Sequence, residues 1–362
     1  MNRTHFDQII DNYAARFVEL NTGDNNEVYK WEIAAEFRPM MDAALAADDR
    51  DFPAKLAAVV LLTKQTIDNG AELAFYALAD YARRELQAAR EVRDALHQLL
   101  TPDGGDLEVR TQRFTEFLNF CESMRARYCP DSWRYRASIR LPMMITGFYD
   151  SDHYYMYKAS QAQAYADCVE FYDDWGSGAK MDLRIYHRMC DELIEAIKSH
   201  PQFSNIRDDR VKFAKKPLHP DIELHILAFD VIFCCTVYNL FEGIHYSVRN
   251  AEEKRIHLEK MNEAINARAN HAEALDRMAR LDYAEAFLRK SSPSAARSPT
   301  SGSALVRSPA CLAKSSKHDS PDLITPQRSY GTTASRQDCF PSKRKRMPPN
   351  MTSWSRCSVR RR

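Results

Sequence analysis

The feature that most limits what this chain can fold into is an abrupt change of composition at Ser291. From there to the last residue the chain is rich in Ser, Pro and Arg, lacks apolar periodicity, and carries 14 Lys and Arg residues against 3 Asp and Glu. Such a segment cannot bury enough apolar surface to offset the entropy lost on ordering. We therefore expect residues 291–362 to be a disordered basic tail, and a folded core to come from residues 1–290.

Two origins are consistent with this tail. It is either a genuine segment whose basic clusters at 343–346 and 360–362 would bind nucleic acid or an import receptor, or the out-of-frame translation of a GC-rich gene, which yields text rich in Ser, Arg and Pro. We favour the second origin, a truncated protein ending in a frameshift product, because the preceding helical segment stops without a cap.

The composition of residues 1–290 narrows the class of protein. They hold 37 Lys and Arg against 47 Asp and Glu, which argues against broad non-specific nucleic-acid binding but leaves room for a local basic groove. The nine cysteines of the chain are scattered, with no CxxC pair, which favours buried free thiols over a metal or disulfide framework. The sequence has no signal peptide and no apolar run of about 18 residues, so we expect a cytoplasmic protein without membrane contact.

Apolar residues recur at three- and four-residue spacings through most of residues 1–290, which predicts amphipathic helices. The expected helices cover residues 4–20, 26–41, 53–100 as two helices broken at 69–70, 107–128, 159–171, 181–197, 222–241 and 251–289. The segment 222–241 is apolar nearly all round, so we expect it to be a central buried helix. The long polar segment 251–289 is typical of a connecting or coiled-coil arm.

Residues 139–158 interrupt the helical pattern. Two short runs rich in β-branched and aromatic residues, 139–148 and 153–157, flank a turn-forming sequence at 149–152. This pattern predicts an embedded β-hairpin. The expected fold is therefore mainly α, with three parts: a multi-helix module with the hairpin over residues 1–249, a helical linker or coiled-coil arm over 250–290, and the tail over 291–362.

Four blocks within residues 1–245 resemble one protein family in sequence and in order. They are NEVYKWE at 26–32, the predicted strand at 138–148, HYYMYK at 153–158 and LHILAFDVIF at 224–233. These blocks are similar to the helical N-terminal region of McrB-like AAA+ proteins, the nucleotide-hydrolysing subunits of modification-dependent restriction systems. The resemblance implies a recognition or scaffold module of a defence ATPase that contacts DNA, a nuclease or an AAA+ partner subunit.

The motor domain of that family is absent from this sequence. It would need a phosphate-binding loop of the form GxxxxGK[ST], and none of the ten glycines falls in that arrangement. We therefore expect no nucleotide hydrolysis, no catalytic residues, no cofactor and no metal site. On this interpretation the chain carries the recognition module and the linker arm alone.

Five residues are the candidate contacts to nucleic acid or to a partner: Lys30, Trp31, Tyr155, Tyr157 and Lys158. They combine aromatic faces with cations, and single-stranded or flipped bases bind to such combinations. Tyr155 and Tyr157 would share one face of the predicted strand. The alternative is that this face belongs to the core. Lys158 would then be a solvent-exposed residue at a sheet edge, where its charge prevents pairing with another strand.

Two further hypotheses compete with DNA recognition. A self-standing protein-interaction scaffold would form homo-oligomers through the 250–290 arm and would lose them when the chain is cut at about Arg249. An enzyme with an unrecognised site around His225 is the other. Because His225 and Asp230 lie about 140° apart around a helix, they do not share a face, and a hydrogen-bonded core histidine is favoured.

Overall fold

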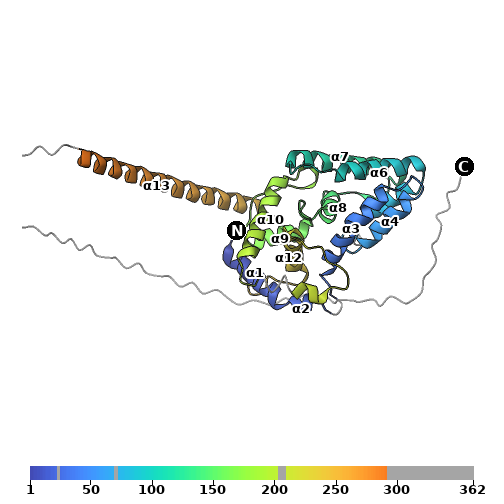
Figure 1. The fold of residues 1–362 in the computed structure, drawn as a ribbon, viewed down its shortest axis with the longest axis horizontal. Coiled ribbons are helices and arrows are strands. Elements are labelled where there is room, and N and C mark those ends of the chain that lie inside the picture. Colours follow the sequence, from blue (N-terminus) through green and yellow to red (C-terminus); the bar gives the residue numbers. More distant parts are fainter. Residues whose placement is uncertain (23–24, 69–71, 203–208, 292–362) are drawn as a thin grey trace, which may run out of the picture. The chain divides into compact units, whose positions relative to one another are not determined.

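The computed structural model describes residues 1–22, 25–68, 72–202 and 209–291, and these are mainly α-helical (Figure 1). No β-strand occurs in these ranges. The same ranges also contain two short 3-10 helices, η1 (Trp133–Tyr135) and η2 (Gly178–Lys180). The α-helices are α1 (Arg3–Ala15), α2 (Phe17–Leu20), α3 (Tyr29–Leu45), α4 (Phe52–Leu62), α5 (Ala74–Ala82), α6 (Leu86–Leu100), α7 (Leu107–Tyr128), α8 (Arg140–Tyr149), α9 (Ala159–Cys168), α10 (Leu183–Ser199), α12 (His225–Val237) and α13 (Ala251–Ser291).

The helical periodicity of the sequence is confirmed in most segments, with differences at helix ends. The expected helix at 4–20 is divided at Arg16 into α1 and α2, and its whole predicted apolar stripe is buried. Pro39 lies inside α3 and does not end it. Residues 53–100 form three helices where two were expected, because the backbone is extended at Glu85, between α5 and α6. No Gly or Pro marks this break in the sequence.

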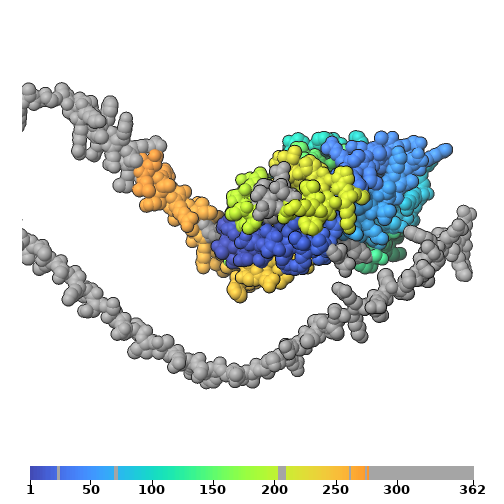
Figure 2. All heavy atoms as spheres, turned by 60° about the horizontal axis from the view of Figure 1, so that its bottom comes forward, coloured from blue at the N-terminus to red at the C-terminus, as the bar shows by residue number. Residues whose placement is uncertain are grey.

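The predicted central helix is α12, which packs against α1, α3, α9 and α10. Nine of its residues are buried. Asp221 caps its start by accepting hydrogen bonds from the backbone N–H groups of Ile226 (3.0 Å) and Leu227 (3.0 Å). Figure 2 shows the N-terminal residues lying alongside the residues around α12, and Asn12 Nδ2 donates to the backbone oxygen of Leu240 at 2.9 Å. The two ends of the helical body thus meet in one core.

The predicted β-hairpin at 139–158 is wrong. Residues 140–149 form α8, in which eight consecutive residues, 141–148, are buried. A run that is apolar on every side carries no periodicity to distinguish a buried strand from a buried helix. Pro142 lies in the first turn of α8, where a backbone N–H has no partner within the helix and its loss costs little. The surrounding helices bury α8 on all sides, and its backbone satisfies its own hydrogen bonds.

The second half of the predicted hairpin, residues 153–157, is a turn followed by a buried extended segment without a ladder. Its side chains do alternate. Tyr154 donates a hydrogen bond to Asp103 (2.9 Å) before α7, whereas Tyr155 packs on His187 of α10. The hydroxyl of Tyr186 in α10 donates a hydrogen bond to the backbone oxygen of Met156 in this segment, at 2.7 Å.

The helix α13 is continuous (Figure 1) and touches the rest of the described chain near its start. Lys254 pairs with Asp167 over 2.5 Å, and His257 packs edge-on against Tyr172. Beyond Leu258, every side chain of α13 that the structure describes is exposed. None of the helices in the described ranges has the length and apolar character needed to cross a membrane. The tail predicted from residue 291 lies, apart from Ser291, outside the described residues.

Candidate functional site

The five predicted contact residues are all buried. Their exposed fractions are 0% for Lys30, 1% for Trp31, 5% for Tyr155, 4% for Tyr157 and 9% for Lys158. The structure brings two of them together, since the ammonium groups of Lys30 and Lys158 lie 4.1 Å and 4.4 Å from the ring centroid of Phe233. The three aromatic residues contact other parts of the core.

Lys30 is the centre of a buried charge cluster between α3 and α12. Its Nζ pairs with Glu27 Oε2 at 2.5 Å and with Asp230 Oδ1. Each carboxylate also accepts a hydrogen bond from a tyrosine: Tyr13 donates to Asp230 at 2.6 Å, and Tyr238 donates to Glu27. The cluster therefore pairs one buried cation with two hydrogen-bonded carboxylates.

The same carboxylates, together with Cys234, lie close enough to form a three-ligand metal group, with their ligand atoms within 4.8 Å of one another. The ammonium of Lys30 already supplies the positive charge there. Burial opposes that charge, but Asp230 and Glu27 outweigh it and hold the pKa of Lys30 well above its usual value. Burial also raises the pKa of Cys234, which disfavours the thiolate that a metal would need. We therefore interpret the cluster as an internal ion pair.

Trp31 is fixed in the core by a polar contact. Its Nε1 donates to Asp221 Oδ2 at 2.9 Å, the carboxylate that caps α12. The guanidinium of Arg210 lies 4.0 Å from the Trp31 ring centroid and 3.6 Å from the same carboxylate. The indole thus connects α3 to the start of α12, and its face is covered by Arg210.

Tyr155 and Tyr157 both face α10. Tyr155 donates to Asp191 at 2.5 Å, and its ring centroid lies 3.9 Å from that of His225. Tyr157 packs edge-on against Tyr186 and accepts a hydrogen bond from Trp175 Nε1 at 3.2 Å. These contacts agree with the alternative in which this face of the segment belongs to the core.

Lys158 differs from the other four because it lacks a polar partner. Its Nζ makes no hydrogen bond and no ion pair with any residue in the described ranges. Burial, together with the smaller effects of the charges of Arg140 and Lys30, lowers its pKa to about 7, against a still smaller opposing effect of Glu27. A substantial fraction of this side chain is therefore a neutral amine near neutral pH.

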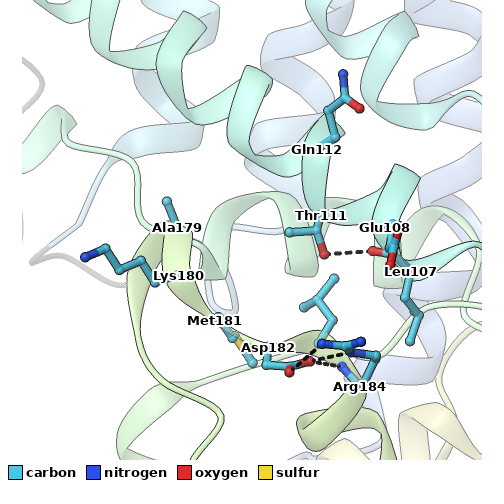
Figure 3. Close-up of a pocket in the computed structure, with 10 residues that line it drawn as sticks. Leu107, Glu108, Thr111, Gln112, Ala179, Lys180, Met181, Asp182 and Arg184 are labelled. Atoms are coloured by element: carbon cyan, nitrogen blue, oxygen red, sulfur yellow. Dashed lines mark hydrogen bonds and ion pairs between the residues drawn. The ribbon is translucent and has the colours of Figure 1, made fainter.

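Figure 3 shows a surface pocket of 470 Å³ between the start of α7 and residues 179–184. Several of its polar groups bond to other residues of the same wall. Thr111 Oγ1 donates back to the carbonyl of Leu107 at 2.7 Å. Asp182 caps α10 and pairs with Arg184 at 3.0 Å. The pocket does not contain any of the five candidate residues, and its contacts stabilise two helix starts.

The most exposed large aromatic side chain of the described chain is Trp133 in η1, which is 66% exposed. The exposed arginines Arg134 and Arg136 lie one and three residues after it. Behind η1, the Tyr135 ring packs against Tyr81, with their centroids 6.1 Å apart. The backbone N–H of Leu73 donates to the carbonyl of Arg134 at 2.8 Å. This surface therefore has a firm attachment to α5.

Sequence reasoning missed the partners of Lys30. Asp230 is an isolated charge in an otherwise apolar helix, and such a residue is rarely buried without a partner. The need of Asp230 for a buried partner was the signal available in the sequence. Lys30, which lies three residues from Glu27 in the NEVYKWE block, could supply that partner. This signal pointed to a cation in the core and away from a surface contact.

Comparisons of the chain with models of protein families, with curated proteins and with solved structures found no match.

Proposed function

We propose that this chain is a non-catalytic scaffold that assembles through α13, with a second copy of α13 as the partner. The observation that carries the proposal is the long exposed face of this helix. Ile265 and Leu275 are each 54% exposed on α13. Most helices in proteins obtain their stability from packing one face, so a helix that leaves large apolar side chains in water is stabilised by a partner.

The spacing of the apolar side chains favours self-association. Leu258, Ile265 and Ala272 recur every seven residues, and Leu275 follows three residues later. This is the a and d spacing of a coiled coil. Since every copy carries the identical stripe, two copies can pair through the same patch in a two-fold arrangement. Arg268 occupies the d position between them and would limit the stability of the pair.

Sedimentation equilibrium of the full chain tests this function. We expect a reversible dimer, and the double variant Ile265→Asp, Leu275→Asp should be a monomer at the same concentration, because a coiled-coil seam does not accept buried unpaired carboxylates. Leu61→Asp is the matched control, since Leu61 is 70% exposed on α4 and its change should leave the mass unaltered. A wild-type monomer over about a hundredfold range of concentration would contradict self-association.

DNA contact, which the resemblance to McrB-like proteins implies, is the second candidate function. The exposed Trp133 beside Arg134 and Arg136 favours it, because single-stranded nucleic acids stack on exposed aromatic rings beside cations. Substitutions of Lys158 and Tyr155 cannot test it, since both residues are buried and their substitution would disturb the core.

The test of the second candidate is a binding titration with single-stranded DNA at two salt concentrations. We expect salt-dependent binding that weakens by about 1–3 kcal/mol in Trp133→Ala, the usual contribution of one stacked base. Leu86→Ala, at an apolar residue 51% exposed on α6, is the control. Equal affinities of the two variants would rule out Trp133 as a stacking residue.

A further inference from the structure

Lys158 lies where two parts of the chain fold back on each other. The extended segment before it passes so close to α8 that a Cβ at Gly147 would lie 2.5 Å from Met156 Cγ and 3.3 Å from the Met156 backbone nitrogen. Two residues later the chain reaches Lys158, the residue immediately before α9. This course brings Lys158 back toward the first turn of α8, where Arg140 lies.

The surroundings of the Lys158 amine are aromatic and cationic. Nζ lies 4.4 Å from the ring centroid of Phe233, and Lys30 shares this ring. Arg140 is near enough for its charge to act on the amine. The Nε of Arg140 is itself buried without a hydrogen-bond partner, while its other nitrogens bind Glu72 and the carbonyls of residues 66 and 67.

Lys30 and Lys158 thus contact the same ring but have opposite electrostatic environments. Lys30 has two carboxylates and is fully buried, so it stays an ammonium ion. Lys158 has no carboxylate partner in the described ranges, is flanked by cations, and keeps 9% of its surface exposed. Desolvation and neighbouring positive charge are the two conditions that convert a lysine into a nucleophile at neutral pH.

We infer that Lys158 is an imine-forming amine that reacts with a small aldehyde or ketone. The nitrogen lone pair attacks the carbonyl carbon and a C–N bond forms. The carbonyl oxygen takes up the two amine protons and leaves as water, so that a C=N bond remains. The step needs no oxidant or reductant. The ring of Phe233, whose centroid lies 4.4 Å from Nζ, excludes water from one side of the amine.

Reductive alkylation of the full chain tests this inference. The protein is treated briefly with acetaldehyde and cyanoborohydride at neutral pH, and each modified lysine is quantified by peptide mass spectrometry. We expect Lys158 to be alkylated about 10- to 100-fold faster than the exposed residues Lys55 and Lys64, because an ordinary lysine is almost wholly protonated at neutral pH. Alkylation of Lys158 at or below the rate of Lys55 and Lys64 would overturn the inference.

The same sample contains its own control for folding. Lys30 should remain unmodified, since it is fully buried and charged, and its modification would show that the protein had opened. A second variant, Arg140→Gln, removes one of the charges that repel the proton from Lys158. It should slow the alkylation of Lys158 relative to Lys55, and an unchanged ratio would contradict the role given to Arg140. These readouts do not depend on assembly through α13 or on DNA.

Discussion

At the scale of single residues, Lys30 shows how a charge can belong to a hydrophobic core. Its side chain is 0% exposed and lies among the rings of Phe229 and Phe233. Removing an ammonium ion from water costs several kcal/mol. The carboxylates of Glu27 and Asp230 offset that cost only because each also accepts a hydrogen bond from a tyrosine. The cluster therefore requires all its members.

Lys30→Met should lower the free energy of unfolding by about 3–5 kcal/mol, because it leaves two carboxylates buried and unpaired. Urea denaturation measures this loss. The control Lys55→Met removes an exposed lysine and should change the free energy by less than about 0.5 kcal/mol. Adding Asp230→Asn to Lys30→Met should restore part of the stability, and a double variant less stable than Lys30→Met alone would argue against the pairing.

His187 makes the stability depend on pH. Burial lowers its pKa to about 3, with smaller contributions from the charges of Arg110 and His225. Because the folded pKa lies below the unfolded value, the unfolded chain takes up the proton first. The stability due to neutral His187 is therefore complete above about pH 6.5 and is lost as the pH falls toward 3.

The variant His187→Gln cannot take up that proton and should lose less stability on acidification. Between pH 6.5 and pH 4 we expect the wild type to lose about 1–3 kcal/mol more than the variant, as measured by urea unfolding at both pH values. Comparing the two proteins cancels the titration of all other groups that the substitution leaves undisturbed. Parallel losses in the two proteins would show that His187 is protonated equally in the folded and unfolded states.

At this scale the sequence did not predict what the candidate residues contact. Lys30, Trp31, Tyr155 and Tyr157 were expected to contact DNA or a partner, and in the structure their polar atoms bond to other residues of this chain. An aromatic residue beside a lysine is compatible with a ligand contact and with a place in the core, since the sequence pattern does not show which residues pack against the ring. Only the tertiary structure shows that Asp230 lies within reach of Lys30.

At the scale of elements, the contrast between α8 and the predicted hairpin has one physical cause. Helices at 107–128 and around 222–241 were recognised because one face is apolar and the other polar, or because the apolar run is long. The run at 139–148 is short and buried on all sides, so its sequence has no periodicity to distinguish helix from strand. The break at residues 83–85 was missed because it contains no Gly or Pro.

The close contact between α8 and the segment before α9 gives a test of this geometry. Gly147→Ala should destabilise the protein by about 1–3 kcal/mol despite the better helix propensity of alanine, because the new Cβ would meet Met156. Combined with Met156→Ala, which removes Cγ, the substitution should cost less than the sum of the two single changes. Strict additivity would mean that the two elements are not in contact at this point.

At the scale of the whole molecule, the sequence predicted a mainly helical body followed by a long arm, and both are present. The body is closed by contacts between distant segments, such as Asn12 with the chain after α12, and no local pattern predicts these. The arm is held to the described body by Lys254 and Arg249, which pair with Asp167 and Glu170. Within the part of the chain that the structure describes, the side chains of its outer part are all exposed, which is why we propose a second copy as its partner.

The most direct measurement of this claim is amide hydrogen exchange across α13 at several protein concentrations. If two copies pair through the stripe of Leu258, Ile265 and Leu275, protection of residues 259–276 should rise with concentration, while protection of the central helix α12 stays constant. The double variant Ile265→Asp, Leu275→Asp should show no such rise. Exchange in residues 259–276 that is independent of concentration in the wild type would contradict assembly through α13.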